Sequence, residues 1–178
     1  MTLPGHIAIA YALKPAVPSV RLWILLVAAE IFDLMFLVLI VFGIENWGNS
    51  HVDLSHGVKM LSPASFPWSH GLFMSAIWSL AAAGITFLIF RDRRTSCIIG
   101  LVVLSHWMLD FIVHPPQLPL LFGGSPKVGL GLWTSGPGLI FSIILELGLL
   151  AGGIAIYVTA RKSQVSGPNE YQVPKARD

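Results

Sequence analysis

Residues 22–44 read LWILLVAAEIFDLMFLVLIVFGI, an apolar run in which Glu30 and Asp33 are the only charged residues. A helix needs about 20 mostly apolar residues to cross the hydrocarbon layer of a membrane. Three further stretches meet this requirement: 68–90, 96–114 and 138–160. The sequence therefore predicts an all-α membrane protein, built as a bundle of about four transmembrane helices.

The composition of the whole chain supports this interpretation. Of its 178 residues, 54% are hydrophobic and 11% are charged, whereas a soluble domain carries about 25% charged residues. The net charge of +2 does not indicate a nucleic-acid partner, because the basic residues cluster beside the apolar runs. Cys97 is the single cysteine, which excludes an internal disulfide, a cysteine-rich zinc site and an iron–sulfur cluster.

The remaining segments are short. Leu3–Leu13 predicts a short N-terminal helix, too short to span a membrane, that ends at the prolines after it. No basic region precedes a long apolar run at the N-terminus, so we expect no cleavable signal peptide. Loop 45–67 is polar and rich in turn residues, and loop 115–137 is rich in Gly and Pro. We expect a transmembrane domain over residues 1–162 and a disordered tail over 163–178.

The basic residues predict how the bundle is oriented. Short cytoplasmic loops of membrane proteins carry an excess of Lys and Arg. If the N-terminus is cytoplasmic, nine of the eleven basic residues lie on that side, and only Lys59 and Lys127 lie on the other. We therefore expect both termini in the cytoplasm and both long loops outside.

The polar residues inside the apolar runs form an unusual set of four acids and three histidines, with no Lys or Arg. A carboxylate within lipid is costly unless it is compensated. Without a basic side chain, the compensating species are protons, a metal ion or water. Histidine and carboxylate together suit zinc, manganese or non-haem iron. The seven residues are Glu30, Asp33, His70, His106, Asp110, His114 and Glu146.

Spacing groups these residues into one site. His106, Asp110 and His114 recur every four residues, so they share one face of their predicted helix. Glu30 and Asp33 are three residues apart and share a face of the first helix. With a rise of about 1.5 Å per residue, all of the set except Glu30 fall at overlapping depths in the outer half of the bilayer. The sequence therefore predicts a metal site that opens to the non-cytoplasmic side.

Each polar residue has an expected role in this site. Glu146 is expected to accept from the second nitrogen of a metal-bound histidine, or to act as general base. His114 is expected to bind a second ion or to shuttle protons at the mouth, with the loop 115–137 lining the entrance. The expected ligands of the metal, with zinc the first candidate and manganese or iron the alternatives, are Asp33, His70, His106 and Asp110.

Simpler interpretations stay open for several residues. Glu30 and Glu146 are also candidates for a hydrogen bond between helices. Adjacent residues on a helix point apart, so the three Ser-His pairs do not predict catalytic dyads. His51 and His56 lie in a loop and are expected to be solvated. Three tryptophans are interpreted as interface anchors or packing residues: Trp68, Trp107 and Trp133.

His6 is ambiguous on the residues alone. The charge rule places it on the cytoplasmic side, away from the proposed site. It joins the site only if Leu3–Leu13 folds into the bundle.

Several segments resemble one bacterial membrane family. They are PWSHGLFMSAIW (67–78), LSHWMLDFIVHPPQLPL (104–120) and GGSPKVGLGLW (123–133), with a weaker similarity at GHIAIAYAL (5–13) and AAEIFDLMF (28–36). The family that they resemble is the uncharacterised YdjM-like group, described as membrane-bound metal-dependent hydrolases of the bacterial inner membrane. Gln117 departs from the family, whose members often have an acid there. The resemblance implies functional positions, metal ligands among them, at His6, Asp33, His70, His106, Asp110 and His114.

Together these observations predict a membrane-embedded metal-dependent hydrolase that acts on an ester or phosphoester of a lipid-like substrate, with a homo-oligomer left open. A proton- or cation-coupled carrier and a non-catalytic, metal-stapled membrane protein are the alternatives. An open coordination position beside a lateral cleft favours the enzyme, and a polar path to both faces favours the carrier. A closed, fully liganded ion favours the structural protein.

Overall fold

The computed structural model describes residues 1–122 and 124–165. The predicted tail 163–178 lies outside the described residues from residue 166 onward, and its residues 163–165 belong to a helix. In chain order the elements are α1 Leu3–Leu13, η1 Lys14–Ala16, α2 Leu22–Val41, β1 Ser50–Asp53, β2 Gly57–Met60, α3 Leu72–Phe90, α4 Arg93–Val113, β3 Leu118–Pro119, β4 Lys127–Val128, η2 Leu132–Thr134 and α5 Gly136–Val165.

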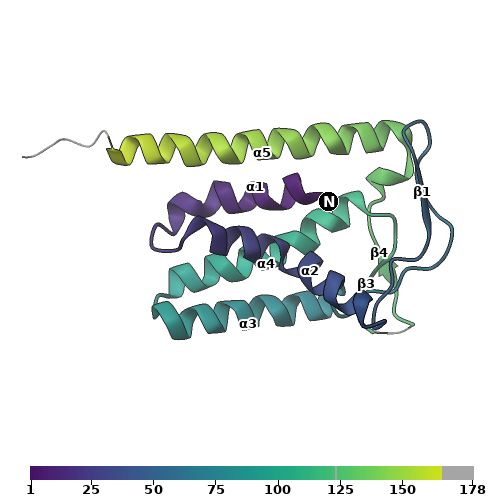
Figure 1. The fold of residues 1–178 in the computed structure, drawn as a ribbon, viewed down its shortest axis with the longest axis horizontal. Coiled ribbons are helices and arrows are strands. Elements are labelled where there is room, and N and C mark those ends of the chain that lie inside the picture. Colours follow the sequence, from purple (N-terminus) through teal and green to yellow (C-terminus); the bar gives the residue numbers. More distant parts are fainter. Residues whose placement is uncertain (123, 166–178) are drawn as a thin grey trace, which may run out of the picture.

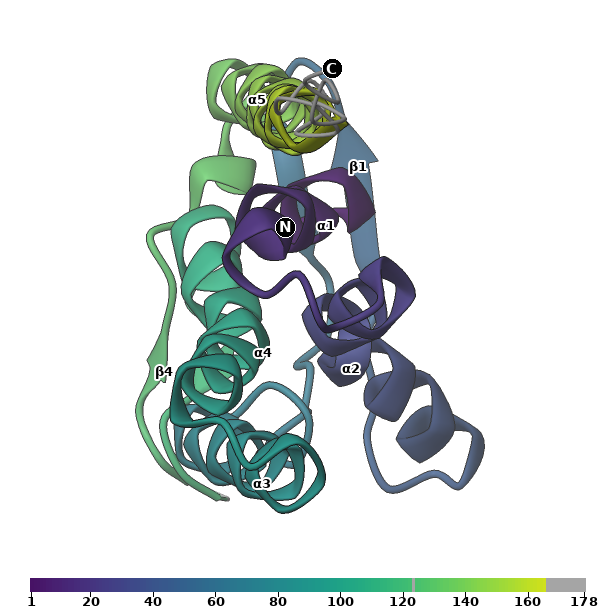
Figure 2. The same ribbon diagram turned by 90° about the vertical axis from the view of Figure 1, so that its left-hand side faces the viewer.

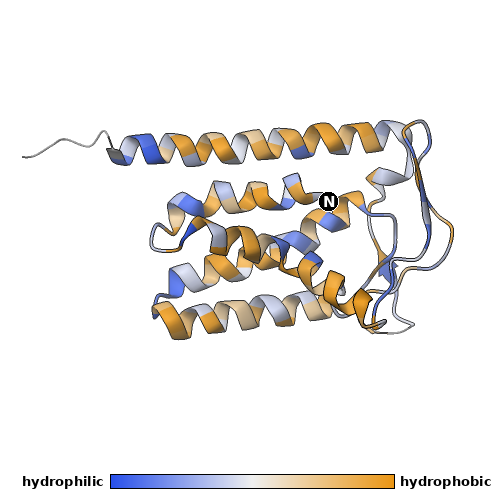
Figure 3. Cartoon of the chain, in the orientation of Figure 1, coloured by the Kyte–Doolittle hydropathy of each residue, from blue (hydrophilic) through white to orange (hydrophobic). Residues whose placement is uncertain are grey.

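Four helices, α2, α3, α4 and α5, are long and apolar enough to cross a membrane, as the sequence predicts. Hydrophobic residues colour most of their length orange in Figure 3. Most boundaries differ from the prediction by a few residues: α2 ends at Val41, α4 covers Arg93–Val113 and α5 covers Gly136–Val165. α3 begins at Leu72 rather than Trp68. The backbone amides of Trp68 and Ser69 donate instead to the Glu45 carboxylate, which holds them in a turn before the helix.

The short helix α1 lies inside the bundle alongside α5 (Figures 1 and 2). It packs against α5, α2 and α4. A Cβ at Gly153 of α5 would lie 2.4 Å from the carbonyl oxygen of Ala8, so glycine permits the two helix backbones to approach. The predicted N-terminal helix is therefore a packed part of the bundle, although it is too short to cross a membrane.

Two small antiparallel sheets lie at one end of the bundle, on the right in Figure 1. β1 and β2 form a hairpin, and β3 pairs with β4. The sequence predicts turns in these loops but no strands, so the all-α expectation is corrected here. Strands of two to four residues are too short to show an alternating pattern. We call this end of the molecule the hairpin end. We call the opposite end, where Lys14 follows α1 and Arg91 and Arg93 lie at the junction of α3 and α4, the basic end.

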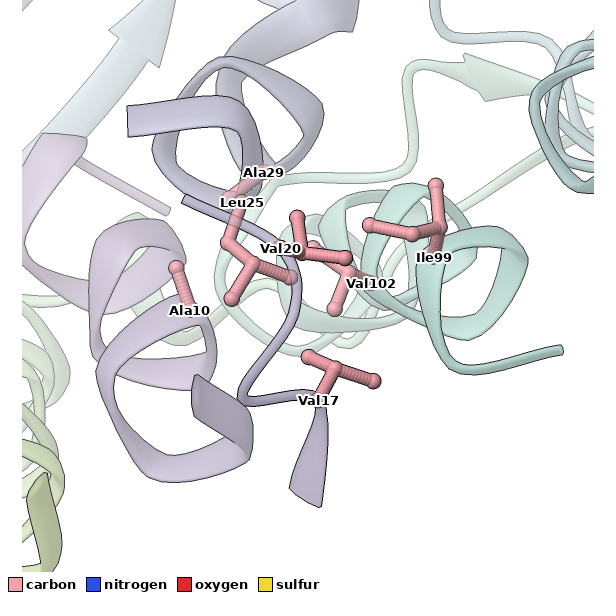
Figure 4. Packing of buried hydrophobic residues seen from close by; sticks show 7 residues of the cluster. All are labelled: Ala10, Val17, Val20, Leu25, Ala29, Ile99 and Val102. Atoms are coloured by element: carbon pink, nitrogen blue, oxygen red, sulfur yellow. The ribbon is translucent and has the colours of Figure 1, made fainter. Parts of the chain in front are cut away.

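Two apolar clusters fill the bundle. The aliphatic cluster, shown in Figure 4, joins α1, α2 and α4 toward the basic end and comprises Ala10, Val17, Val20, Leu25, Ala29, Ile99 and Val102. The aromatic cluster lies toward the hairpin end and comprises Phe32, Ala64, Phe66, Val103, Trp107 and Leu118.

α2 and α3 lie apart in Figure 2. The apolar groove between them has a cavity volume of about 640 Å³ and is lined by Ile31, Leu34, Met35, Val38, Leu39, Ile44, Trp68 and Trp78.

Candidate metal centre

Polar side chains from separate parts of the chain meet inside the bundle, next to the aromatic cluster. Two groups have ligand atoms within 4.8 Å of one another, namely His6, Asp33 and His106, and His70, His106 and Asp110. All the positions implied by the family resemblance come together. They are His6 of α1, Asp33 of α2, His70 just before α3, His106 and Asp110 of α4, and His114 just after α4.

Two imidazoles face two carboxylates. His70 Nε2 lies 3.2 Å from Asp33 Oδ1 and 3.5 Å from Asp110 Oδ2. His106 Nε2 lies 3.6 Å from Asp33 Oδ1 and 3.4 Å from Asp110 Oδ2. Ligand atoms on a tetrahedral ion with bonds of about 2.0–2.1 Å are about 3.3 Å apart. These four residues therefore have the spacing of one metal coordination shell.

The hydrogen bond behind His106 determines which of its nitrogens is free. His106 Nδ1 lies 2.7 Å from the carbonyl oxygen of Ala29, which only accepts, so Nδ1 carries the proton. The lone pair of the neutral ring is then on Nε2, which is buried and has no hydrogen-bond partner. A lone pair aimed at two carboxylate oxygens is repulsive unless a cation lies between them. This is the arrangement of a metal-binding histidine oriented by a second hydrogen bond.

His70 is held in the same way by a relay from the loop before α3. The Ser69 hydroxyl lies 2.6 Å from Glu45 Oε2 and 2.8 Å from His70 Nδ1. Since the carboxylate only accepts, the hydroxyl donates to Glu45 and accepts from His70 Nδ1, so the lone pair of His70 is on Nε2, which faces Asp33 Oδ1 at 3.2 Å. The prediction that adjacent Ser and His residues point apart is wrong for this pair, because both precede the first turn of α3.

Glu45 is a residue that sequence analysis missed, and it takes a role expected of Glu146. Glu146 instead accepts from the backbone nitrogen and the hydroxyl of Thr2. Glu45 is 3% exposed although it directly follows an apolar run, a position where an acid usually faces water. Its sequence context carries no signal, because the contact to Ser69 exists only after the loop folds.

His114 lies deep in the structure rather than at the mouth of a site. It is 3% exposed, and its ring centroid lies 4.5 Å from that of Trp133. The loop after α4 turns back over it, because the backbone nitrogen of Gly131 donates to the carbonyl oxygen of His114. The prediction of an entrance beside His114 is therefore wrong. Its Nε2 points inward and lies 3.5 Å from Asp110 Oδ1.

Gln117 orients His114 from behind. Its side-chain amide lies 2.8 Å from His114 Nδ1, while Gln117 Oε1 is buried without a partner. The two ends of an amide are exchanged by a half rotation, and the hydrogen-bond network decides between them. With Oε1 turned to Nδ1, the amide accepts from the ring and leaves His114 Nε2 free. Gln117, at a position where the family that the sequence resembles often has an acid, thus contacts and orients a histidine.

His6 lies at the site and not at the basic end with Lys14. α1 starts beside α4 and runs toward the basic end, so its first turn carries His6 into the centre of the bundle (Figure 1). His6 Nε2 lies 3.4 Å from Asp110 Oδ1 and 3.2 Å from the carbonyl oxygen of Met1. Its ring stacks on that of His106, with centroids 3.6 Å apart. The nitrogen of Met1 also contacts Asp110 Oδ1.

Asp33 connects the site to the surface. Its side chain is 44% exposed, whereas the side chains of the other five site residues are at most 4% exposed. Leu37, one turn farther along α2, is 64% exposed, so the opening lies on the apolar outer surface of α2. The groove between α2 and α3 is a different feature, because Ile31 and Met35 line it and residues two positions from Asp33 point away from it.

Burial keeps the histidines outside the spanning helices neutral. Desolvation lowers the pKa of His70 to about 4 and holds the pKa of His114 well below its usual value. Both rings are therefore uncharged at pH 7, which is the form that binds a metal. His51 and His56 are exposed as predicted, and His56 Nδ1 lies 2.8 Å from Asp53 Oδ2.

The tryptophans expected to be anchors or packing residues differ in position. Trp107 is buried in the aromatic cluster, and its indole nitrogen donates to the carbonyl oxygen of His70. Trp133 donates to the hydroxyl of Ser142. Trp68 is 44% exposed. The hydrogen bond from Trp107 therefore helps to hold the site residue His70 in place.

Comparisons with protein-family models, with curated proteins and with solved structures give no match to this chain.

Proposed function

We propose that this protein is a membrane-embedded metal-dependent hydrolase that acts on an ester or phosphoester of a lipid-like substrate. The observation that carries the proposal is the spacing of Asp33, His70, His106 and Asp110, whose facing atoms are 3.2–3.6 Å apart. The buried, unpartnered Nε2 of His106 and the Nε2 lone pair of His70, which faces Asp33 Oδ1 at 3.2 Å, favour a metal over a set of ordinary hydrogen bonds. Zinc is the first candidate, with manganese or iron as alternatives.

A metal at these ligands supplies hydrolytic chemistry, because it lowers the pKa of a bound water toward neutrality and polarises the scissile group. Asp33 is the ligand beside which a substrate approaches, since it is the exposed member of the set. Glu146, held by Thr2, is a proposed proton-transfer group, and His114, held by Gln117, either transfers protons or binds a second ion. The role of His114 follows the family resemblance, and that of Glu146 follows its burial within a spanning helix.

The position of the opening supports a lipid-like substrate. Asp33 lies within a helix that is apolar enough to cross a membrane, and Leu34 and Leu37 beside it are 46% and 64% exposed. A substrate that reaches Asp33 along this surface crosses an apolar belt. Lateral entry from the bilayer in which the protein resides therefore suits a molecule with hydrocarbon chains better than a polar solute.

The packing of the bundle favours an enzyme over a carrier. The aliphatic cluster fills the bundle between the site and the basic end with residues such as Leu25 and Val102, both 0% exposed. A carrier needs a polar route to both faces of the membrane. The exposed edge at Asp33 equally argues against a closed structural ion.

The test is hydrolysis by protein purified into lipid nanodiscs, screened against lipid esters and phosphoesters. We expect chelation to abolish turnover and added zinc or manganese to restore it. Asp33→Asn should lose the activity, whereas the matched control Asp53→Asn, in the exposed β1–β2 hairpin, should keep it. Metal-replete protein that is inert across the panel would refute the proposed activity.

A further inference from the structure

We propose that the site holds two divalent metal ions bridged by the carboxylate of Asp110. This inference rests on the proposed metal centre and deepens it. The two oxygens of Asp110 face different histidines. Oδ2 lies 3.5 Å from His70 Nε2 and 3.4 Å from His106 Nε2. Oδ1 lies 3.4 Å from His6 Nε2 and 3.5 Å from His114 Nε2.

The four distances divide the ligands into two sets. Each is close to the spacing of about 3.3 Å between ligand atoms on one tetrahedral ion. Asp33 Oδ1 completes the first set, beside His70 and His106. The second set has three protein ligands, Asp110 Oδ1, His6 and His114, and so leaves a coordination position for water or substrate. A bridging carboxylate suits the metal–metal separation of about 3.5–4 Å that is typical of two-metal hydrolytic sites.

The side chains of the second set differ in how firmly they are held. Gln117 fixes the ring of His114 from behind, as Ser69 fixes that of His70. His6 Nδ1 is buried without a partner, and the Met1 nitrogen lies against the same Asp110 oxygen. An ion in the second set must displace this nitrogen and break the contact of His6 Nε2 with the carbonyl oxygen of Met1, 3.2 Å away, so we expect it to bind more weakly than the first.

Charge balance supports two ions rather than one. Four carboxylates lie on spanning helices, where basic side chains occur only at exposed helix ends among the described residues. Glu30 Oε1 is buried with no hydrogen-bond partner, which is costly for a charged oxygen in an apolar environment. With all four ionised, one divalent ion and the Met1 amino group that contacts Asp110 Oδ1 leave one negative charge uncompensated, whereas two divalent ions that displace this group neutralise all four. The carboxylates are Glu30, Asp33, Asp110 and Glu146.

A two-ion centre gives the proposed hydrolysis a specific arrangement. Two ions held on the two sides of Asp110 would stabilise both the attacking and the leaving oxygen of an in-line displacement. The sequence leaves His114 open as a ligand of a second ion or as a proton shuttle. In a two-ion centre it is a ligand and does not transfer protons.

Loading with manganese allows the number of bound ions per chain to be measured and shows whether two ions are magnetically coupled through a bridging ligand. The purified full chain is stripped with a chelator, reloaded with Mn²⁺ alone, and examined by elemental analysis and electron paramagnetic resonance. We expect two Mn²⁺ per chain and a spectrum of spin-coupled ions. His114→Ala should retain one Mn²⁺ and show the six-line spectrum of an isolated ion. The control His56→Ala, at an exposed histidine, should behave as the wild type.

The outcomes separate this inference from the proposed function. One Mn²⁺ per chain in the wild type, with hydrolysis intact, overturns the two-ion centre and leaves the hydrolase. Two ions without spin coupling also overturn it, because Asp110 then does not bridge them. Protein that binds no Mn²⁺ and hydrolyses nothing overturns both. The wild-type spectrum decides the point even if a variant fails to fold.

Discussion

The interior of the bundle is filled by aliphatic side chains toward the basic end and by histidine and aspartate side chains toward the hairpin end. One face of α4 presents Ile99 and Val102 toward the basic end, then His106 and Asp110 toward the hairpin end, all buried. The helix and its neighbours continue, but within a single turn the side chains change from hydrocarbon to metal-ligating groups. The aliphatic end is stabilised by packing, whereas the site end has buried His and Asp side chains that could hold a metal ion. We therefore expect substitutions at the site end to change metal binding and substitutions at the aliphatic end to change stability.

The largest effect is expected from removing the charge that joins the metal ligands. Asp110→Asn keeps the shape of the side chain but faces His70 and His106 with a neutral amide. Metal content, measured by elemental analysis, should fall to background, and hydrolysis should disappear. The protein should still elute as a folded species in detergent, because the aliphatic cluster is untouched. Stoichiometric metal in this variant would contradict the assignment of Asp110.

A cavity at the aliphatic end should have the opposite result. Leu25 is 0% exposed, and Leu→Ala in a well-packed core costs about 2–5 kcal/mol of unfolding free energy. Leu25→Ala should lower stability in denaturant titrations by this amount while folded protein keeps its full metal content. Leu37→Ala, at an exposed position of the same helix, is the control. If Leu25→Ala releases metal without unfolding, the two ends are coupled more closely than their packing indicates.

A smaller loss should follow from removing the support behind His70. Glu45→Gln weakens the hydrogen bond to Ser69 without touching a ligand, and such outer partners typically contribute about 10–100-fold in metal affinity or activity. Competition with a fluorescent chelator measures the affinity. Asp53→Asn, in the same loop but exposed, should bind metal as the wild type does. Equal affinity in both variants would show that the relay through Ser69 orients nothing.

The smallest effect belongs to the start of α4, far from the metal. The Asp92 side chain accepts from the amides of Thr95 and Arg94, and hydrogen bonding with the Thr95 side chain, together with these amides, lowers the pKa of the carboxyl. A depressed carboxyl pKa contributes stability that is present above the unfolded value of about 3.9 and is lost as pH falls through the folded value. Asp92→Asn should therefore remove a shallow pH dependence of stability below about pH 4. An unchanged acid profile would exclude this cap as its source.

The sequence predicts those features that depend on one helix or on the lipid solvent. The four spanning helices follow from hydropathy, because a backbone in lipid has few alternatives to a helix. His106 and Asp110 follow from their spacing on a single face. Their convergence with Asp33 and His70 follows from similar depth together with the absence of basic side chains nearby.

Features that depend on how loops and partial helices fold could not be predicted in this way. The charge rule assumes segments that either cross the membrane or lie outside it, so it left His6 ambiguous, because His6 lies on a short helix that packs inside the bundle. Glu45 acts through Ser69 across a loop whose contacts leave no local pattern. The loop over His114 closes a surface where its glycines and prolines indicate only turns.

The most direct test of the metal centre is X-ray absorption spectroscopy of the purified protein loaded with zinc. The account predicts a shell of nitrogen and oxygen ligands at about 2.0–2.1 Å, with the outer-shell scattering of several imidazoles that is lost in part in His106→Ala. Protein that retains no zinc, or zinc whose spectrum lacks imidazole scattering and is unchanged in His106→Ala, would contradict it.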